Sequence, residues 1–112
     1  RLDVLSGEDP IACESMLKGA KGVISVTNNV VPKIMKVMCD VARKGNQAEA
    51  RSLDAQLQPL HEAMFVEANP IPVKWMLAEM DMIPSGIRLP LTPLSKTYHE
   101  KVKQAMQQAQ MI

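Results

Sequence analysis

The chain has 112 residues, in which 13 lysines and arginines face 12 aspartates and glutamates for a formal net charge of +1. With one Phe, one Tyr and one Trp and no basic run longer than two residues, the sequence argues against a basic, base-stacking surface for nucleic acid. No apolar run approaches the ~18 residues of a membrane helix, and the first residues lack an export-signal pattern. We therefore expect a cytoplasmic protein without nucleic-acid or membrane partners.

The first third of the chain has β-α-β spacing. Residues 2–6 are predicted to form a short strand, and the acidic residues before Pro10 open a helix that ends at Gly19. Residues 22–27 are predicted to form a second strand. A crossover through a single helix makes the two strands parallel.

The strand predicted at residues 22–27 is apolar on both faces, which is typical of a parallel sheet covered on both sides. Such a strand needs a neighbour on each edge, and the chain supplies only residues 2–6. We therefore expect this chain to be a C-terminal piece of a larger α/β protein. Refolding of this segment into helix, or its pairing between two copies, remains the alternative.

The remaining residues are predicted to be mainly helical. A helix is expected over residues 32–44, followed by a longer one capped by Asn46 and kinked at Pro59, then a short helix over residues 73–80. Residues 81–93 have no period and contain four of the boundary-forming Pro and Gly residues, so they predict a surface loop. Ser95 is expected to cap the last helix. The apolar stripes of these helices indicate core packing.

Residue spacing alone shows no active site. Cys13 and Cys39 stand far apart and are expected to behave as small buried hydrophobes. His61 and His99 stand alone, so no metal site is predicted, and no cofactor is expected. Lys74, beside Trp75, comes nearest to a buried amine, but its helical pattern favours a solvated side chain.

Several short segments together carry a family resemblance. They are Leu5-Ser6-Gly7-Glu8-Asp9, Gly22-Val23-Ile24-Ser25-Val26, Leu60-His61, Phe65-Val66-Glu67, Asn69-Pro70-Ile71-Pro72-Val73-Lys74-Trp75 and Leu89-Pro90-Leu91-Thr92-Pro93-Leu94. In order and spacing they resemble the dihydrodipicolinate synthase (4-hydroxy-tetrahydrodipicolinate synthase) family. The resemblance covers essentially the whole chain but only the C-terminal two fifths of such an enzyme. The run from Asn69 to Trp75 is the most specific part, and it favours this family over related sialate lyases and sugar-acid aldolases.

The resemblance implies a mostly α chain: the last two βα units of a TIM (β/α)8 barrel in residues 1–45, then a C-terminal helical region in residues 46–112, with the barrel incomplete. Enzymes of this family condense pyruvate, held as a Schiff base, with aspartate semialdehyde in the diaminopimelate pathway of lysine biosynthesis. Their Schiff-base lysine and the residues that assist it correspond to positions before Arg1. The chain alone is therefore expected to hold no catalytic residue and to be inactive.

Three residues match family positions that line the pyruvate side of the pocket. Gly7 and Ile24 match backbone positions at the carboxyl ends of the last strands, and Glu8 matches a rim position that is usually acidic. Each residue type also has a local explanation: a turn for glycine, barrel packing for isoleucine, and the helix dipole for glutamate.

A second hypothesis is a free-standing helical interaction or assembly module, and the reading frame upstream of Arg1 would distinguish the two. The incomplete sheet predicts a homo-oligomer or pairing with the missing barrel portion. We expect residues 46–112 to stay helical, and residues 1–30 either to pair across copies or to leave the barrel conformation.

Overall fold

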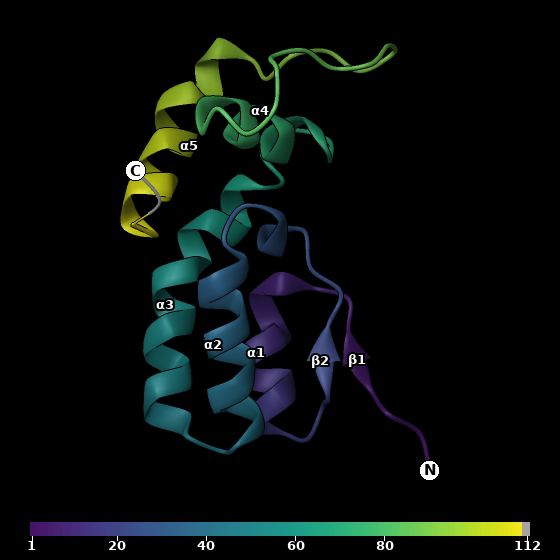
Figure 1. Ribbon diagram of the computed structural model, residues 1–112, viewed down its shortest axis with the longest axis vertical. Coiled ribbons are helices and arrows are strands. Elements are labelled where there is room, and N and C mark those ends of the chain that lie inside the picture. Colours follow the sequence, from purple (N-terminus) through teal and green to yellow (C-terminus); the bar gives the residue numbers. More distant parts are fainter. Residues whose placement is uncertain (111–112) are drawn as a thin grey trace.

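The computed structural model describes residues 1–110, which form a short parallel strand pair and a larger set of helices (Figure 1). Within this range no helix is both long and apolar enough to cross a membrane. In chain order the elements are β1 (Leu5–Ser6), α1 (Asp9–Leu17), β2 (Gly22–Val23), a 3₁₀ turn (Thr27–Asn29), α2 (Pro32–Arg43), α3 (Gln47–Ala63), α4 (Ile71–Glu79) and α5 (Lys96–Gln108).

The two strands are parallel and joined through α1, as the spacing predicted, with Leu5 opposite Gly22 and Ser6 opposite Val23. Their predicted lengths were wrong, because each strand contains only two residues. The expectation that the strand at residues 22–27 lacks a second neighbour in this chain agrees with the structure, since the sheet has two strands within residues 1–110 and Ile24 is 71% exposed. With a single neighbouring strand the backbone ladder stops early, and a 3₁₀ turn follows at Thr27–Asn29.

Helices α2 and α3 are joined by a tight turn whose residues explain its shape. Gly45 has a φ of +81°, a conformation that glycine adopts without steric cost. Its N–H donates to Ala42 O and that of Asn46 donates to Val41 O, the Schellman pattern that ends α2. The Asn46 side chain then accepts from Glu49 N and caps α3, as predicted.

One core runs from α1 to α5, and α3 is its common member. Helix α3 packs against α1 and α2 on one part of its length and against α5 on another. Flexible thioether side chains fill much of this core. The fully or almost fully buried methionines are Met16, Met35, Met38, Met64, Met76 and Met106.

Helices α4 and α5 lie at one end of the molecule, and the strand pair lies beside α1 toward the other (Figure 1). The predicted helix over residues 73–80 begins slightly earlier, at Ile71. Residues 81–93 form the predicted loop, without helix or strand. Ser95 stands at the N-cap of α5, although its side chain makes no capping hydrogen bond.

Several large apolar side chains on and beside the strands face solvent. Leu5 in β1 is 54% exposed, and Leu2 and Val4 before it are 91% and 64% exposed. Together with Ile24 they form an apolar strand surface that no other described part of the chain covers.

Candidate functional site

The two parallel strands end side by side and bring Gly7 and Ile24 together. Gly7 directly follows β1, and Ile24 directly follows β2. The Ile24 N–H donates to Ser6 O over 2.9 Å, which fixes the two chain segments at the carboxyl edge of the strand pair. This edge is where enzymes built from parallel βα units keep their reacting groups.

A pocket of about 420 Å³ opens at this edge. It contains two of the three predicted site residues, Gly7 and Glu8, whereas the Ile24 side chain lies outside the lining and is mostly exposed. The lining residues are Gly7, Glu8, Asp9, Pro10, Val26 and Phe65. Another hollow, of about 330 Å³, lies around Gly19 and Arg43 and includes none of the predicted site residues.

The turn from β1 into α1 is closed by a serine. Ser6 Oγ accepts from Glu8 N over 3.2 Å and lies 3.1 Å from Glu8 O, to which it donates. Glu8 is the N-cap residue of α1, but its side chain makes no capping hydrogen bond and is exposed. Its carboxylate is therefore free to face the pocket mouth.

Asp9 is the buried acid of this site, with only 4% of its surface exposed. Its Oδ2 accepts from Val26 N over 2.9 Å and from Thr27 N over 3.1 Å, and its Oδ1 accepts from Ser25 Oγ. A buried carboxylate needs such compensation, because burial without hydrogen bonds is costly. The start of α1 is thereby tied to the segment that follows Ile24.

On its other side this segment meets α3. Thr27 Oγ1 and His61 Nδ1 share a hydrogen bond of 2.7 Å, and both residues are fully buried. Burial lowers the pKa of His61, against the opposing pull of Asp9 and Asp54, so the imidazole is neutral near pH 7. His61 Nε2 is the one buried side-chain polar atom without a hydrogen-bond partner among residues 1–110.

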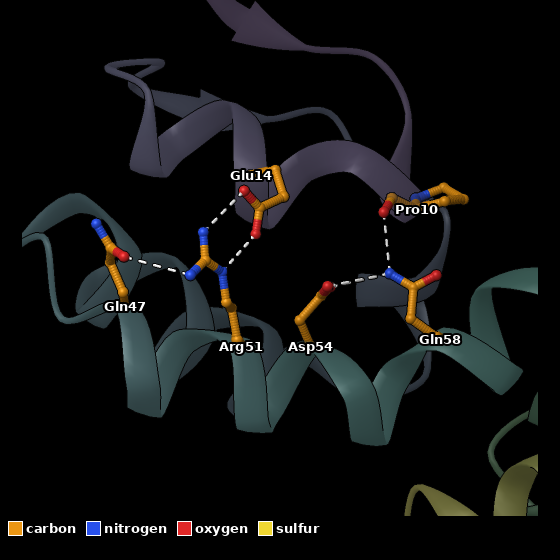
Figure 2. Close-up of polar contacts among 6 residues, drawn as sticks. All are labelled: Pro10, Glu14, Gln47, Arg51, Asp54 and Gln58. Atoms are coloured by element: carbon orange, nitrogen blue, oxygen red, sulfur yellow. Dashed lines mark hydrogen bonds and ion pairs between the residues drawn. The ribbon is translucent and has the colours of Figure 1, made fainter.

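A row of polar contacts fastens α1 to α3 (Figure 2). Arg51 Nε lies 2.7 Å from Glu14 Oε1, and its Nη2 lies 3.3 Å from Oε2. Two turns further along α3, Gln58 Nε2 donates to Pro10 O over 2.9 Å and to the Asp54 carboxylate over 3.1 Å. Because Pro10 lines the pocket, these contacts set the position of one pocket wall.

The cysteines and histidines do not form a metal centre in the part of the chain that the structure describes, where no three potential ligands cluster. Cys13 and Cys39 are both free thiols. Burial, with the nearby Asp54 and Glu14 carboxylates, raises the pKa of Cys13 to about 11, so this thiol is a poor nucleophile.

Sequence reasoning missed Asp9, Thr27 and His61 as parts of the site. Asp9 was explained only as one of the acidic residues that open α1, and His61 as an isolated residue. The contact between Asp9 and Thr27 joins residues 18 positions apart, and the contact between Thr27 and His61 joins residues 34 positions apart. The only sequence signal was that Asp9, Thr27 and His61 each lie within or beside one of the quoted family segments.

Two strand–helix units followed by a helical region, with a pocket at the carboxyl ends of the strands, define a portion of a parallel α/β-barrel enzyme. The model of the dihydrodipicolinate synthetase family matches residues 1–109. The chain belongs to this family.

Similar proteins bear the same family name. The 4-hydroxy-tetrahydrodipicolinate synthase of Coxiella burnetii is 56% identical over 107 residues, which cover 96% of this chain and 37% of that protein. The synthase of Pseudomonas aeruginosa is 56% identical over 105 residues, or 94% of this chain and 36% of that protein. The chain thus spans well under half the length of these relatives.

The crystal structure of the chloride-inhibited dihydrodipicolinate synthase from Acinetobacter baumannii complexed with pyruvate superposes with a TM-score of 0.94 at 48% identity, over 99% of this chain and 38% of that one. The overlap includes nearly all of residues 1–30. The expectation that these residues leave the barrel conformation is therefore wrong, because the β1–β2 pair and α1 support each other locally. The alternative expectation, pairing across copies, stays a prediction.

Proposed function

We propose that this chain is part of a cytoplasmic 4-hydroxy-tetrahydrodipicolinate synthase, a Schiff-base lyase that condenses pyruvate with aspartate semialdehyde in lysine biosynthesis. The observation that carries the proposal is the junction of Gly7 and Ile24 at the carboxyl edge of two parallel strands, fixed by the 2.9 Å bond from Ile24 N to Ser6 O. The similarity to relatives of that name, one of them complexed with pyruvate, supports it.

In this proposal the backbones at Gly7 and Ile24 line the pyruvate side of the pocket, and Glu8 supplies an acidic rim. Gly7 adopts no left-handed conformation, and an added Cβ would meet no atom within 4 Å. Nothing in this chain therefore requires glycine at position 7. Close approach of a substrate, or of another barrel strand, is a reason for glycine that the local fold does not give.

The amine that forms the Schiff base comes, in this proposal, from the part of the barrel outside this segment. The six residues that line the pocket offer carboxylate, backbone and apolar groups. Residues 1–45 supply two βα units and residues 46–112 the helical region that supports them. The apolar strand surface of Leu2, Val4, Leu5 and Ile24 then packs against the remaining barrel, or against a second copy in an oligomer.

A chimera tests the function. In the Coxiella burnetii synthase, the matched segment is replaced by this chain, and the parent synthase serves as control. We expect borohydride with pyruvate to trap one reduced adduct per chimera, and the chimera to consume aspartate semialdehyde. A folded chimera that forms no adduct would contradict the proposal.

The isolated chain provides the complementary measurement. We expect no pyruvate adduct on it, because its Schiff-base partner lies elsewhere. A stoichiometric adduct on the isolated chain would overturn the assignment of the lysine to the remaining barrel.

The exposed apolar strand surface also suits a free-standing assembly module. The two functions predict different partners. The test adds the barrel portion of a relative as a separate polypeptide. If this chain is a synthase segment, the barrel portion should bind it. If this chain is a module that assembles with itself, the barrel portion should not bind.

A further inference from the structure

We infer that Asp9, Thr27 and His61 are positioning residues that hold the segment 25–29 from two sides and thereby fix the Ile24 backbone at the pocket. The inference rests on the proposed function, because it assigns a purpose to Ile24. These three residues act through the backbone of the segment and not on a substrate.

The first contact comes from α1. The Asp9 carboxylate receives the N–H groups of Val26 and Thr27 and the Ser25 hydroxyl. Ser25 Oγ in turn accepts from Asn28 N over 2.9 Å, so the carboxylate and one hydroxyl together accept three consecutive backbone N–H groups of this segment. Hydrogen bonds to a charged acceptor are stronger than neutral ones.

The second contact comes from α3. His61 reaches the same segment through the 2.7 Å bond between its Nδ1 and Thr27 Oγ1. Both side chains are 0% exposed, and a hydrogen bond in such surroundings is costly to leave unmade. The ring bonds through Nδ1 alone, because its Nε2 has no partner in the described residues.

Together with the bond from Ile24 N to Ser6 O, these contacts restrain the chain on both sides of Ile24. The orientation of the Ile24 peptide is therefore set by α1, β1 and α3 jointly. A group placed by three elements is preorganised, and loss of one restraint should weaken pyruvate binding more than it slows the chemical step.

Thr27 gives the first test, in the chimera described above. We expect Thr27→Val to raise KM for pyruvate about tenfold while kcat changes less than about twofold, and Thr27→Ser to restore KM because it keeps the hydroxyl. Thr97→Val, at an exposed threonine of α5, is the matched control and should change neither value. Equal KM values for Thr27→Val and the unsubstituted chimera would overturn the inference.

His61 gives a test of which ring nitrogen matters. An Asn side chain can place a polar atom near the position of Nδ1, and a Gln side chain near that of Nε2. We expect His61→Asn to keep a KM for pyruvate closer to that of the unsubstituted chimera than His61→Gln does. The reverse order would show that an Nε2 contact carries the effect, and would overturn the inference.

Hydrogen exchange separates this inference from the proposed function. In Asp9→Asn the amide can no longer accept all the bonds of the carboxylate, so the N–H groups of Val26 and Thr27 should exchange at least about tenfold faster. Asp40→Asn is the matched control, because Asp40 pairs with Lys36 on α2. A chimera without pyruvate binding refutes the function alone, whereas unchanged exchange in Asp9→Asn overturns the positioning role whatever the activity.

Discussion

The Arg51 guanidinium donates two hydrogen bonds to the Glu14 carboxylate, from Nε over 2.7 Å and from Nη2 over 3.3 Å, and so joins α3 to α1 (Figure 2). The two side chains are 54% and 45% exposed, so solvent screens the pair. We expect Arg51→Ala to lower the urea midpoint slightly. Arg51→Lys should recover only part of this loss, because a lysine ammonium cannot make the two parallel bonds of a guanidinium. The loss of midpoint in Arg51→Ala should shrink in high salt. A midpoint loss that persists in high salt would mean that the arginine stem, and not its charge, stabilises the helix pair.

Asp54 is expected to make stability fall as pH rises. Partial burial raises the pKa of its carboxyl, although the Gln58 hydrogen bond opposes this. The Asp54 carboxyl therefore ionises at a lower pH in the unfolded chain than in the folded protein. Stability is lost as pH rises from the unfolded-state pKa to the folded-state pKa. Asp54→Asn should remove this loss and gain less than about 1 kcal/mol at pH 7, because the group is only partly buried and solvent screens it.

Glu14→Gln is the matched control with the opposite sign. The Arg51 hydrogen bond lowers the pKa of Glu14, so its contribution is present above the unfolded pKa and lost as pH falls through the folded one. Urea unfolding at several pH values measures both variants. Parallel pH profiles for the two variants would contradict these assignments.

Cys13 should resist alkylation in the folded protein. Its side chain is 0% exposed and its pKa is about 11, so little thiolate is present at neutral pH. Cys39 is half-buried, and burial also raises its pKa, so we expect slow but measurable labelling there. Mass spectrometry after iodoacetamide treatment, with and without denaturant, distinguishes the two sites. Equal labelling of both thiols in the folded protein would place Cys13 in solvent.

The Asn46 cap should contribute measurably to α3. Its side chain accepts from Glu49 N, and removal of such a cap costs about 1 kcal/mol. We expect Asn46→Ala to lower the free energy of unfolding by this amount and Asn46→Asp to preserve it. Thermal and urea unfolding report the change, and an unaffected Asn46→Ala variant would show that packing alone starts the helix.

Trp75 is half-buried and lies with its ring centroid 4.7 Å from that of His99. We expect a moderately blue-shifted emission maximum and a cost for Trp75→Ala below the about 3–5 kcal/mol of a fully buried ring. Trp75→Phe, which keeps a ring beside His99, should recover much of this cost. Emission at the position of free tryptophan would contradict the packing.

The sequence predicted the helices better than the strands, and the reason is physical. A helix satisfies its backbone within itself, so the signals at Pro32, Gly45 and Asn46 located the ends of α2 and α3 closely. A strand depends on neighbours, and residues 24–27 have a β-rich composition without a second strand beside them in this chain. Composition therefore overestimated β2.

The site was predictable only as far as local patterns reach. Gly7 and Glu8 were predicted as site residues by resemblance, and both line one pocket in the structure. The bond from Thr27 to His61 joins residues 34 positions apart, and no local pattern distinguishes His61 from any other helical histidine. Such a pairing depends on how α3 packs against the 3₁₀ turn.

Helix α3 contacts α1, which carries part of the pocket lining, and also the distant α5, so the chain is difficult to divide. A cut after Gly45 would strip α1 and α2 of the helix that buries their inner faces, and would leave Leu57 and Leu60 of α3 open to water. The loop at residues 81–93 contacts this core only in part, through Ile87 and Leu91. Tags, labels or inserted domains belong in its exposed stretch at residues 84–86, where the chain can be lengthened without disturbing the shared core.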